Sequence, residues 1–592
     1  MRRAHSVVYL LIAILGVCDV VHAQGEGTPG FVVGACTHFS QGKGIVDRNL
    51  DRIQQAGITS IRDEVPWGAL EREKGKLVMP ESFDTYVRQA AARGVSVLLI
   101  LDYANRFYDD GDRPRSPEAI EGFCRYAEFV VRHFGKHVRL YEVWNEWDIG
   151  IGLSERYRKG GSAEDYVKLL RAVYPRIKAA NPGVMVMAGG CTSGGVKKGW
   201  LEETIKLGAL DFCDAISIHS YNYSAKFPQR GPEACSAWMT GVQEMLRRYK
   251  GGAGVPPLGV AGILPAVRGR DALDTKAQGQ DALATQGRDA LDTKTQGRDA
   301  LATQGQDALA TKMQGRDALD TQGQDALATK TQGRDALATQ GQDALATKTQ
   351  GQDALATQGR DALATKTHGQ DALATGRVTA SGVRSLPGDV PFYVTEMGWP
   401  THVGRNGTDP ELAGSYLARL YLLARTSASF QGIWWYDFQD DGWKADYNED
   451  NFGLVRPDLT PKPAYHVLRH IAPVVAHGRF VDCLPTPDEN LWVLRFQVGR
   501  EDCWALWSAD DQERQVILQT EVPARPVMIR QTGHEAYLTK WGFRDWTNRR
   551  SELVPNRLSL VVGPRPYLIG NDLSGVSVVE VIARLRQAAT TP

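Results

Sequence analysis

The chain has 592 residues, which is long enough for two or more domains built around a large apolar core. Lysine plus arginine and aspartate plus glutamate each number 69, so the formal net charge is zero. This balance argues against nucleic acid as a partner, because such binding relies on excess positive charge. The eight cysteines include no Cys-x-x-Cys pair, so a structural zinc site is not expected.

The first residues have the pattern of a secretory signal peptide over residues 1–23. Two arginines precede an apolar run from Val7 to Val17, and a small residue, Ala23, stands at the expected cleavage point. An uncleaved membrane anchor is the alternative, but the apolar run is shorter than the ~20 residues that a spanning helix needs. We therefore expect a secreted or periplasmic protein without stable membrane insertion after cleavage.

A tandem repeat occupies the middle of the chain. From Gly269 to about Thr375, the unit Gly-(Arg/Gln)-Asp-Ala-Leu-(Ala/Asp)-Thr recurs in lengths of alternately ten and eight residues. Each unit offers one leucine as its only large apolar residue, so it can bury little surface to offset chain entropy. We predict a low-complexity insertion over 251–388, disordered or weakly helical. A continuous helix and a calcium-binding β-roll are the alternatives, but regular glycines disfavour the helix and the Gly-Gly-x-Gly run of the β-roll is missing.

Outside the insertion, residues 31–471 alternate short β-branched runs with longer amphipathic segments, as βα units of a parallel sheet do. Eight such units predict an α/β fold of the (β/α)8 TIM-barrel type. An open doubly wound sheet is the alternative, but no Gly-x-Gly-x-x-Gly run follows a predicted strand. The predicted strands are Phe31–Ala35, Ser60–Arg62, Val95–Leu101, Leu140–Trp144, Val184–Ala188, Ala215–Ile218, Phe392–Thr395 and Gly432–Tyr436, and the predicted helices include Phe83–Arg93, Pro117–Phe134, Ala163–Ala180, Ala234–Tyr249, Glu411–Ser427 and Pro463–His477.

A second, all-β region is predicted to follow the barrel. Short alternating runs separated by turn residues indicate a sandwich-like domain over 479–570. From Ser574 onward the sequence suggests a short amphipathic helix. The predicted strands of this region are Leu491–Phe496, Trp504–Ser508, Gln515–Gln519, Val527–Arg530 and Leu558–Val562.

The carboxyl ends of the barrel strands carry the residues with the most chemistry, and this is where barrel enzymes place their active sites. Glu146 follows the fourth strand and Glu396 ends the seventh, on opposite sides of the barrel mouth. Glycoside cleavage requires such a pair, one carboxyl to protonate the leaving oxygen and one to attack or support the sugar carbon. Neither a metal ion nor an organic cofactor is needed for this chemistry. The other candidates at strand ends are Arg62, Asn145, His219, Tyr221 and Trp434.

Two of these segments resemble a known group of enzymes. Tyr141-Glu-Val-Trp-Asn-Glu146 and Tyr393-Val-Thr-Glu396-Met-Gly-Trp399 are similar to the acid/base and nucleophile strands of the retaining (β/α)8 glycoside hydrolases of clan A. Within the clan, the β-rich tail makes the chain most similar to glycoside hydrolase family 39 and the PslG-type endoglycosidases. One departure is Trp147, which stands where the family commonly has proline after the acid/base glutamate.

The resemblance implies a retaining O-glycosyl hydrolase that acts on the equatorial bonds of a polysaccharide or oligosaccharide. Glu396 would be the nucleophile and Glu146 the acid/base, ~5–5.5 Å apart. Asn145 would bind the hydroxyl next to the reacting carbon. A catalytically inactive carbohydrate-binding barrel is the alternative function.

The remaining candidates have a structural alternative each. Arg62 would hold Glu396 ionised, unless it pairs with neighbouring carboxylates at the barrel rim. Tyr221 would orient the nucleophile and His219 the acid/base, although a histidine at a strand end is often a core residue. The candidate sugar platforms, which equally suit loop anchors or core residues, are Trp147, Trp399, Trp434 and Trp67.

Overall fold

The structure is a computed structural model that describes residues 30–250, 389–510 and 512–519, together with the strands and some connections between 528 and 583. The predicted signal peptide and the whole of the predicted insertion lie outside the described residues. Among the helices that are described, none combines the length and apolar character that crossing a membrane requires.

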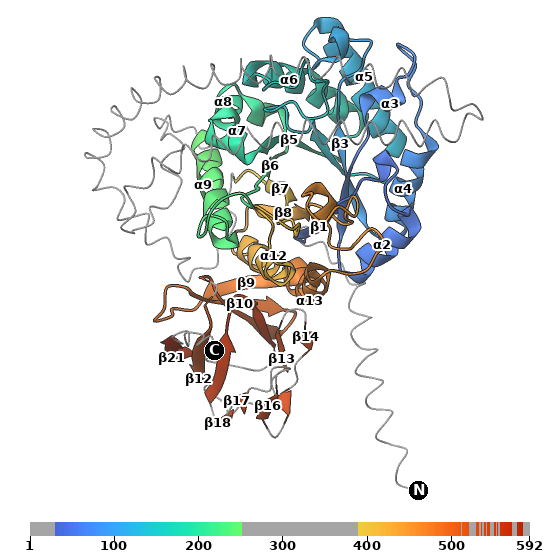
Figure 1. Cartoon of the computed structure of the whole chain (residues 1–592). Coiled ribbons are helices and arrows are strands. Elements are labelled where there is room, and N and C mark those ends of the chain that lie inside the picture. The colour runs from blue at the N-terminus through green and yellow to red at the C-terminus, as the bar shows by residue number, and fades with distance from the viewer. Residues whose placement is uncertain are drawn as a thin grey trace, which may run out of the picture. The chain divides into compact units, whose positions relative to one another are not determined.

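Eight parallel strands form a closed barrel in the order β1 to β8, as the sequence predicts. The barrel closes because β1 pairs with β2 on one side and with β8 on the other. Figure 1 shows the strands at the centre with helices around them. The strands are β1 (Val32–Cys36), β2 (Ser60–Glu64), β3 (Ser96–Leu101), β4 (Leu140–Val143), β5 (Met185–Thr192), β6 (Ala215–His219), β7 (Phe392–Met397) and β8 (Phe430–Trp435).

The longer helices pack on the barrel in two ways: α5 (Pro117–Phe134) buries one apolar face, whereas every residue of α12 (Pro410–Ala424) from Ala413 onward is buried. In α5, Ser116 caps the first turn by accepting a hydrogen bond from the Ala119 amide, and Phe123 lies on the buried face. The predicted ends of α5, α6 and α13 agree with the structure. The helices are η2 (Phe39–Gln41), α2 (Val46–Gln55), α3 (Trp67–Leu70), α4 (Glu81–Ala92), η3 (Asp109–Gly111), α6 (Ala163–Ala180), α7 (Ser193–Lys197), α8 (Trp200–Lys206), η4 (Ala209–Phe212), α9 (Pro232–Lys250), α12 (Pro410–Ala424), η6 (Glu449–Asn451) and α13 (Pro463–His477).

The barrel interior is filled in layers by alternate residues of the strands. An apolar layer of buried side chains includes Leu98, Met187, Tyr393 and Trp434. Two residues further along β4 from the partly buried Leu140, the inward position holds Glu142, a fully buried carboxylate. The apolar layer therefore closes the barrel beneath a polar layer at the carboxyl ends of the strands.

The chain between α9 and β7 leaves and re-enters the barrel at adjacent points. The described residues stop at Lys250, the last residue of α9, and resume at Asp389, just before β7. Arg247 Nε lies 2.9 Å from Asp389 Oδ1, so an ion pair joins the two ends. This pair lies at the amino-terminal end of β7, whereas Glu396 lies toward the carboxyl end of that strand.

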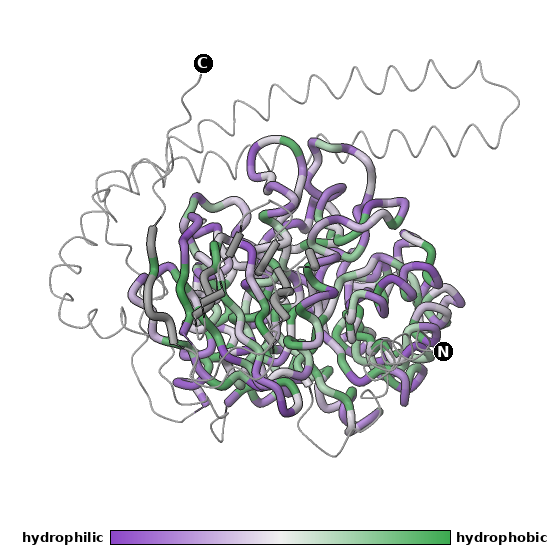
Figure 2. Tube along the Cα trace, turned by 90° about the horizontal axis from the view of Figure 1, so that it is seen from below, coloured by the Kyte–Doolittle hydropathy of each residue, from purple (hydrophilic) through white to green (hydrophobic). Residues whose placement is uncertain are grey.

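The C-terminal region consists of antiparallel sheets, as predicted. The two larger sheets enclose a core of their own. Alternate residues of the six-stranded sheet face different neighbours: Trp504 and Leu506 contribute to the core between the sheets, whereas Ala505 and Trp507 belong to the barrel's core cluster. Figure 2 shows hydrophobic and hydrophilic stretches alternating along the trace of the described residues. The six-stranded sheet is β14 (His534–Glu535), β13 (Met528–Gln531), β20 (Tyr567–Gly570), β11 (Glu501–Ser508), β10 (Leu491–Val498) and β9 (Arg479–Cys483), the four-stranded sheet is β18 (Leu553–Val554), β19 (Arg557–Val562), β12 (Arg514–Gln519) and β21 (Ser577–Ala583), and the three-stranded sheet is β15 (Leu538–Thr539), β16 (Gly542–Arg544) and β17 (Arg550–Ser551).

The prediction for the last segment is wrong. Instead of a short amphipathic helix after Ser574, the chain forms β21, which pairs antiparallel with β12 and extends the β-region to Ala583. The run Ser-Val-Val-Glu-Val-Ile-Ala is rich in β-branched residues, which favour a strand once a partner edge is present.

Candidate active site

The two predicted carboxylates meet at the barrel mouth, on either side of one imidazole. Nδ1 of His219, from the end of β6, lies 2.8 Å from Glu146 Oε1 and 3.4 Å from Glu396 Oε2. One ligand atom from each of the three side chains lies within 4.8 Å of the others. The side chains of Glu146 and Glu396 remain 12% and 11% exposed, so both can be approached from the mouth.

The surroundings shift the two carboxyl groups in opposite directions. Burial raises the pKa of Glu146, and the charge of Glu396 acts in the same direction, against the hydrogen bond from His219. Burial also opposes ionisation of Glu396, but His219 and Arg62 outweigh it and hold the pKa of Glu396 below its usual value. One carboxyl group therefore favours the protonated form and the other the charged form. Such a divergence is typical of an acid and a nucleophile in one site.

Arg62, from β2, connects the two halves of the site. Its Nη1 donates to Glu396 Oε1 at 2.6 Å and its Nη2 donates to Asn145 Oδ1 at 3.0 Å. Tyr221 completes the shell of the nucleophile candidate by donating from its hydroxyl to Glu396 Oε2 at 3.1 Å. The structure thus brings together all the polar candidates named from the sequence.

Glu142 is a buried residue of this site that the sequence reasoning missed. It accepts a hydrogen bond of 2.8 Å from Arg62 Nε, and its other oxygen accepts bonds from Ser217 Oγ at 2.6 Å and Thr395 Oγ1 at 2.8 Å. Since Glu142 is fully buried, it neutralises Arg62 from below and fixes the plane of the guanidinium. The available signal was strand alternation, because Glu142 is the penultimate residue of β4 and points inward with Leu140.

The segment that carries the acid/base candidate has an unusual backbone. Trp144 and Glu146 adopt positive φ angles of 69° and 48°, in the left-handed region that non-glycine residues rarely occupy. The Glu146 amide donates to the carbonyl of Gly190 at 2.9 Å. A Cβ atom on Gly190 would lie 3.0 Å from the Trp144 carbonyl oxygen, so this close approach favours glycine.

The tryptophans predicted as sugar platforms are buried, which favours the alternative that they are core residues or loop anchors. Trp434 points into the barrel but lies in the apolar layer, where its Nε1 donates to Ser60 Oγ at 3.1 Å. Trp147 packs against Trp144 with its ring centroid 4.8 Å away. Trp399 donates from Nε1 to the Arg230 carbonyl at 3.0 Å and is a loop anchor.

The other aromatic residues near the site differ in how far they are exposed. Tyr436, two residues beyond Trp434, packs edge-on against Tyr221 with 6.1 Å between ring centroids. Trp67, another candidate, is fully buried and donates to Glu71. Trp443, in the loop after β8, is 65% exposed and was not singled out from the sequence. The number of tryptophans indicated aromatic contacts, but sequence alone did not reveal which ring is exposed.

Two groups of described residues bring potential metal-ligand atoms close together. They are Glu146 with His219 and Glu396, and His38 with Asp437 and Asp441. In each group a protein cation already pairs with a carboxylate: Arg62 lies 2.6 Å from Glu396, and Lys43 lies 2.6 Å from Asp441. These donor sets therefore suit internal ion pairs better than a metal ion.

Comparison with solved structures finds proteins of similar fold, whereas comparison with sequences finds none. No family model matches the sequence, and no curated protein matches it significantly. A solved structure of a family 39 glycoside hydrolase from the gut symbiont Bacteroides cellulosilyticus WH2 is similar, with a TM-score of 0.54, 20% identity, and coverage of 91% of this chain and 81% of that chain. The fold of this chain is therefore similar to that of this family 39 glycoside hydrolase.

Two further solved structures give lower scores. The family 39 enzyme from Xanthomonas axonopodis pv. citri has a TM-score of 0.47 and 12% identity, over 93% of this chain and 96% of that chain. The family 30 endoxylanase from Clostridium papyrosolvens C71 has a TM-score of 0.46 and 10% identity, over 92% and 97%.

Proposed function

We propose that the protein is a retaining glycoside hydrolase that cleaves O-glycosidic bonds of a polysaccharide or oligosaccharide. The observation that carries this proposal is the geometry of Glu146 and Glu396, whose carboxylate oxygens lie within 4.8 Å of each other on either side of His219. Retaining enzymes hold their two carboxyl groups ~5–5.5 Å apart, whereas inverting enzymes need ~6.5–9.5 Å to admit a water molecule. The short separation supports retention.

In the first step, Glu396 attacks the anomeric carbon while Glu146 donates its proton to the departing oxygen. The lowered pKa of Glu396 keeps this carboxylate charged, and the raised pKa of Glu146 keeps its proton available. The bond to the leaving oxygen breaks as the bond to Glu396 forms. The product of this step is a covalent glycosyl ester.

In the second step, Glu146 removes a proton from a water molecule, which attacks the same carbon and releases Glu396. Two inversions restore the original configuration. Arg62 and Tyr221 each hold one oxygen of Glu396, so they orient the carboxylate in both steps. Asn145, held by Arg62 and by a 2.9 Å bond to the Tyr103 hydroxyl, is placed to bind the neighbouring sugar hydroxyl.

The decisive experiment measures release of reducing sugar from polysaccharides and of phenol from aryl glycosides, with the full chain and the variants Glu396→Ala and Glu146→Ala. We expect Glu396→Ala to lose activity and to regain it with azide, giving a glycosyl azide of inverted configuration. Glu146→Ala with azide gives the azide of retained configuration, because azide then attacks the glycosyl ester.

Glu203→Ala serves as the matched control, because Glu203 is an exposed carboxylate on α8, outside the site. This variant retains full activity. Absence of hydrolysis on every substrate, with sugar binding unchanged by both site substitutions, contradicts the proposal and favours an inactive carbohydrate-binding barrel.

A further inference from the structure

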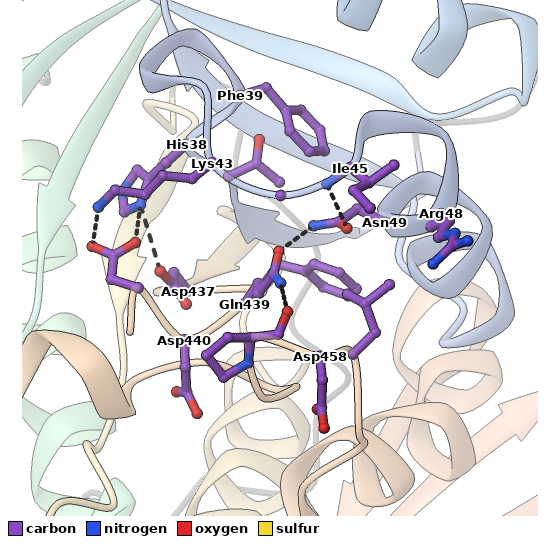
Figure 3. A pocket seen from close by; sticks show the side chains of 16 residues that line it. His38, Phe39, Lys43, Ile45, Arg48, Asn49, Asp437, Gln439, Asp440 and Asp458 are labelled. Carbon is purple, nitrogen blue, oxygen red and sulfur yellow. Dashed lines mark hydrogen bonds and ion pairs between the residues drawn. The ribbon is translucent and has the colours of Figure 1, made fainter. Parts of the chain in front are cut away.

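A pocket of about 390 Å³ lies beside the site, between the loops that follow β1 and β8. Figure 3 shows His38 and Lys43 side by side on one wall, with Asp437 close to His38 and Arg48 toward the other end. Nothing in the mechanism above uses these residues. The pocket lies at the carboxyl ends of the strands, on the same face of the barrel as the two carboxylates.

Two tyrosine side chains, Tyr221 and Tyr436, lie between the nucleophile candidate and this pocket. The Tyr436 ring packs edge-on against Tyr221, which donates to Glu396, with 6.1 Å between ring centroids. The same ring also packs edge-on against His38, with 5.6 Å between ring centroids. Direct side-chain contacts therefore connect the nucleophile candidate, through Tyr221 and Tyr436, to the pocket wall at His38.

The order of strands decides which part of a substrate the pocket would receive. The leaving group departs on the side of Glu146, which protonates it and follows β4. In a closed barrel of eight strands, β8 and β1 lie across from β4. The pocket is therefore on the side of the sugar that becomes attached to Glu396, toward the non-reducing end of the substrate.

The polar wall of the pocket is held in place by ion pairs. His38 Nδ1 lies 2.9 Å from Asp441 Oδ1 and 3.6 Å from Asp437 Oδ2, and Lys43 Nζ lies 2.6 Å from Asp441 Oδ2. Burial opposes the charged imidazole, but the two carboxylates outweigh it and raise the pKa of His38 to about 9. Lys43 remains 41% exposed, so its ammonium group can donate further hydrogen bonds into the pocket.

The rest of the lining adds one available cation and apolar surface. Arg48 is exposed and forms no hydrogen bond or ion pair with its side chain to any residue that the structure describes. Ile45, which is 56% exposed, and Leu459 provide apolar contact area. Ring faces of sugars bind such apolar side chains, while their hydroxyls bind charged and polar ones.

The charges of the pocket are balanced, which favours a neutral occupant. His38 and Lys43 face Asp441, and Asp440 is neutralised by Lys462 at 2.9 Å. An acidic sugar would need an excess of cations and an amino sugar an excess of carboxylates. When Lys462 is counted with the lining residues, four cations (His38, Lys43, Arg48 and Lys462) face four aspartates (Asp437, Asp440, Asp441 and Asp458), so neither excess is present.

We propose that this pocket is a subsite for a neutral sugar residue of the substrate, located beyond the residue that reacts with Glu396 and bound by Lys43 and Arg48. The inference rests on the proposed glycosidase function and deepens it. It implies that the enzyme prefers substrates with at least two sugar residues before the cleaved bond.

The test compares kcat/KM for 4-nitrophenyl β-diglycosides and β-monoglycosides of the same sugar: cellobioside with glucoside, xylobioside with xyloside, and mannobioside with mannoside. We expect the unmodified enzyme to prefer the diglycoside of its sugar. In Lys43→Ala and in Arg48→Ala, the ratio of the two values falls about tenfold, which corresponds to about 1.4 kcal/mol. Lys206→Ala on α8 is the matched control, because Lys206 is 38% exposed and pairs with Glu203.

A binding measurement runs in parallel and needs no turnover. Calorimetric titration of Glu396→Ala, with and without Lys43→Ala, uses cellotetraose, xylotetraose and mannotetraose, and we expect affinity to fall about tenfold when Lys43 is replaced. Dependence of binding on Lys43 without any hydrolysis supports the subsite while refuting the glycosidase. Hydrolysis in which neither the ratio nor the affinity depends on Lys43 or Arg48 overturns the subsite alone.

One further outcome also overturns the proposal. Activity that EDTA abolishes and Ca²⁺ or Zn²⁺ restores, together with a ratio that is insensitive to Lys43→Ala, assigns His38, Asp437 and Asp441 to a cation instead.

Discussion

Glu146 and His219 are joined by a 2.8 Å hydrogen bond, and the same ring nitrogen of His219 lies 3.4 Å from Glu396. One imidazole therefore faces both carboxyl groups of the proposed reaction. Its position lowers the pKa of each group, but Arg62 acts on Glu396 in addition, so only the pKa of Glu396 falls below its usual value. The pKa values of the two carboxyl groups therefore shift in opposite directions because of Arg62 and burial, and not because of the histidine alone.

The first prediction concerns the pH dependence of kcat/KM. Activity requires Glu396 ionised and Glu146 protonated, so it rises through the lowered pKa of Glu396 and falls through the raised pKa of Glu146. We expect a bell-shaped profile with a wide plateau. In Glu146→Gln, measured with an aryl glycoside whose leaving group needs no proton, the decline at high pH disappears and the rise at low pH stays. A decline that persists in this variant contradicts the assignment of Glu146.

The second prediction concerns stability. Replacing Glu142 by leucine leaves the buried Arg62 without one of its two carboxylates, and breaking a buried ion pair costs about 3–5 kcal/mol. We expect a loss of this size in the free energy of unfolding, measured with a chemical denaturant. Glu128→Gln is the control, because Glu128 pairs with Arg176 on the partly exposed surface and its loss costs about 0–1 kcal/mol. Equal losses in both variants would refute the role given to Glu142.

The third prediction concerns stability as a function of pH. Burial raises the pKa of Glu449 from 4.5 to about 7, although Tyr436 donates a hydrogen bond to it. The folded state therefore binds this proton more tightly than the unfolded state, and the resulting stability is lost as pH rises from about 4.5 through 7. Glu449→Gln removes this loss. The difference in unfolding free energy between variant and parent grows by up to about 3 kcal/mol over this range, measured by denaturant titration at several pH values. A constant difference contradicts the prediction.

The fourth prediction concerns the insertion. Because the Arg247–Asp389 ion pair already joins the two ends, a linker of about six residues can replace residues 251–388. We expect kcat/KM and the melting temperature to match those of the full chain. A large loss of activity with the fold retained would show that the insertion contributes to the site.

The fifth prediction concerns Trp443. Its exposed ring, two residues after Asp441 in the pocket wall, suits stacking on a sugar of a polymeric substrate. Trp443→Ala should raise KM for the polymer severalfold, in keeping with about 1 kcal/mol for an aromatic contact, and leave the melting temperature unchanged. Trp399→Ala gives the contrasting result, a loss of about 3–5 kcal/mol in stability, because Trp399 is buried. An unchanged KM in Trp443→Ala contradicts the platform role.

The sequence was sufficient for the barrel because each strand is a short apolar run between turn residues, and because parallel strands place their carboxyl ends on one face. That rule alone brought Arg62, Glu146 and Glu396 to one place before any contact was known. Their contacts confirm the placement: Arg62 lies 2.6 Å from Glu396, and His219 lies 2.8 Å from Glu146.

The rule about strand ends does not tell how deep in the barrel an inward-pointing side chain lies. Trp434 and Tyr436 share an inward direction, but only the second reaches the mouth, because each step of two residues rises one layer. Glu142 was missed for the related reason that it lies below the strand end. β21 was mistaken for a helix because a short apolar run takes its conformation from the strand beside it.

The ion pair between Arg247 and Asp389 also bears on how the gene can change. Near-identical repeat units are prone to slippage during replication, which adds or removes whole copies. Because each copy enters the chain between residues that the barrel already holds together, natural isolates can differ in copy number while their catalytic faces stay alike.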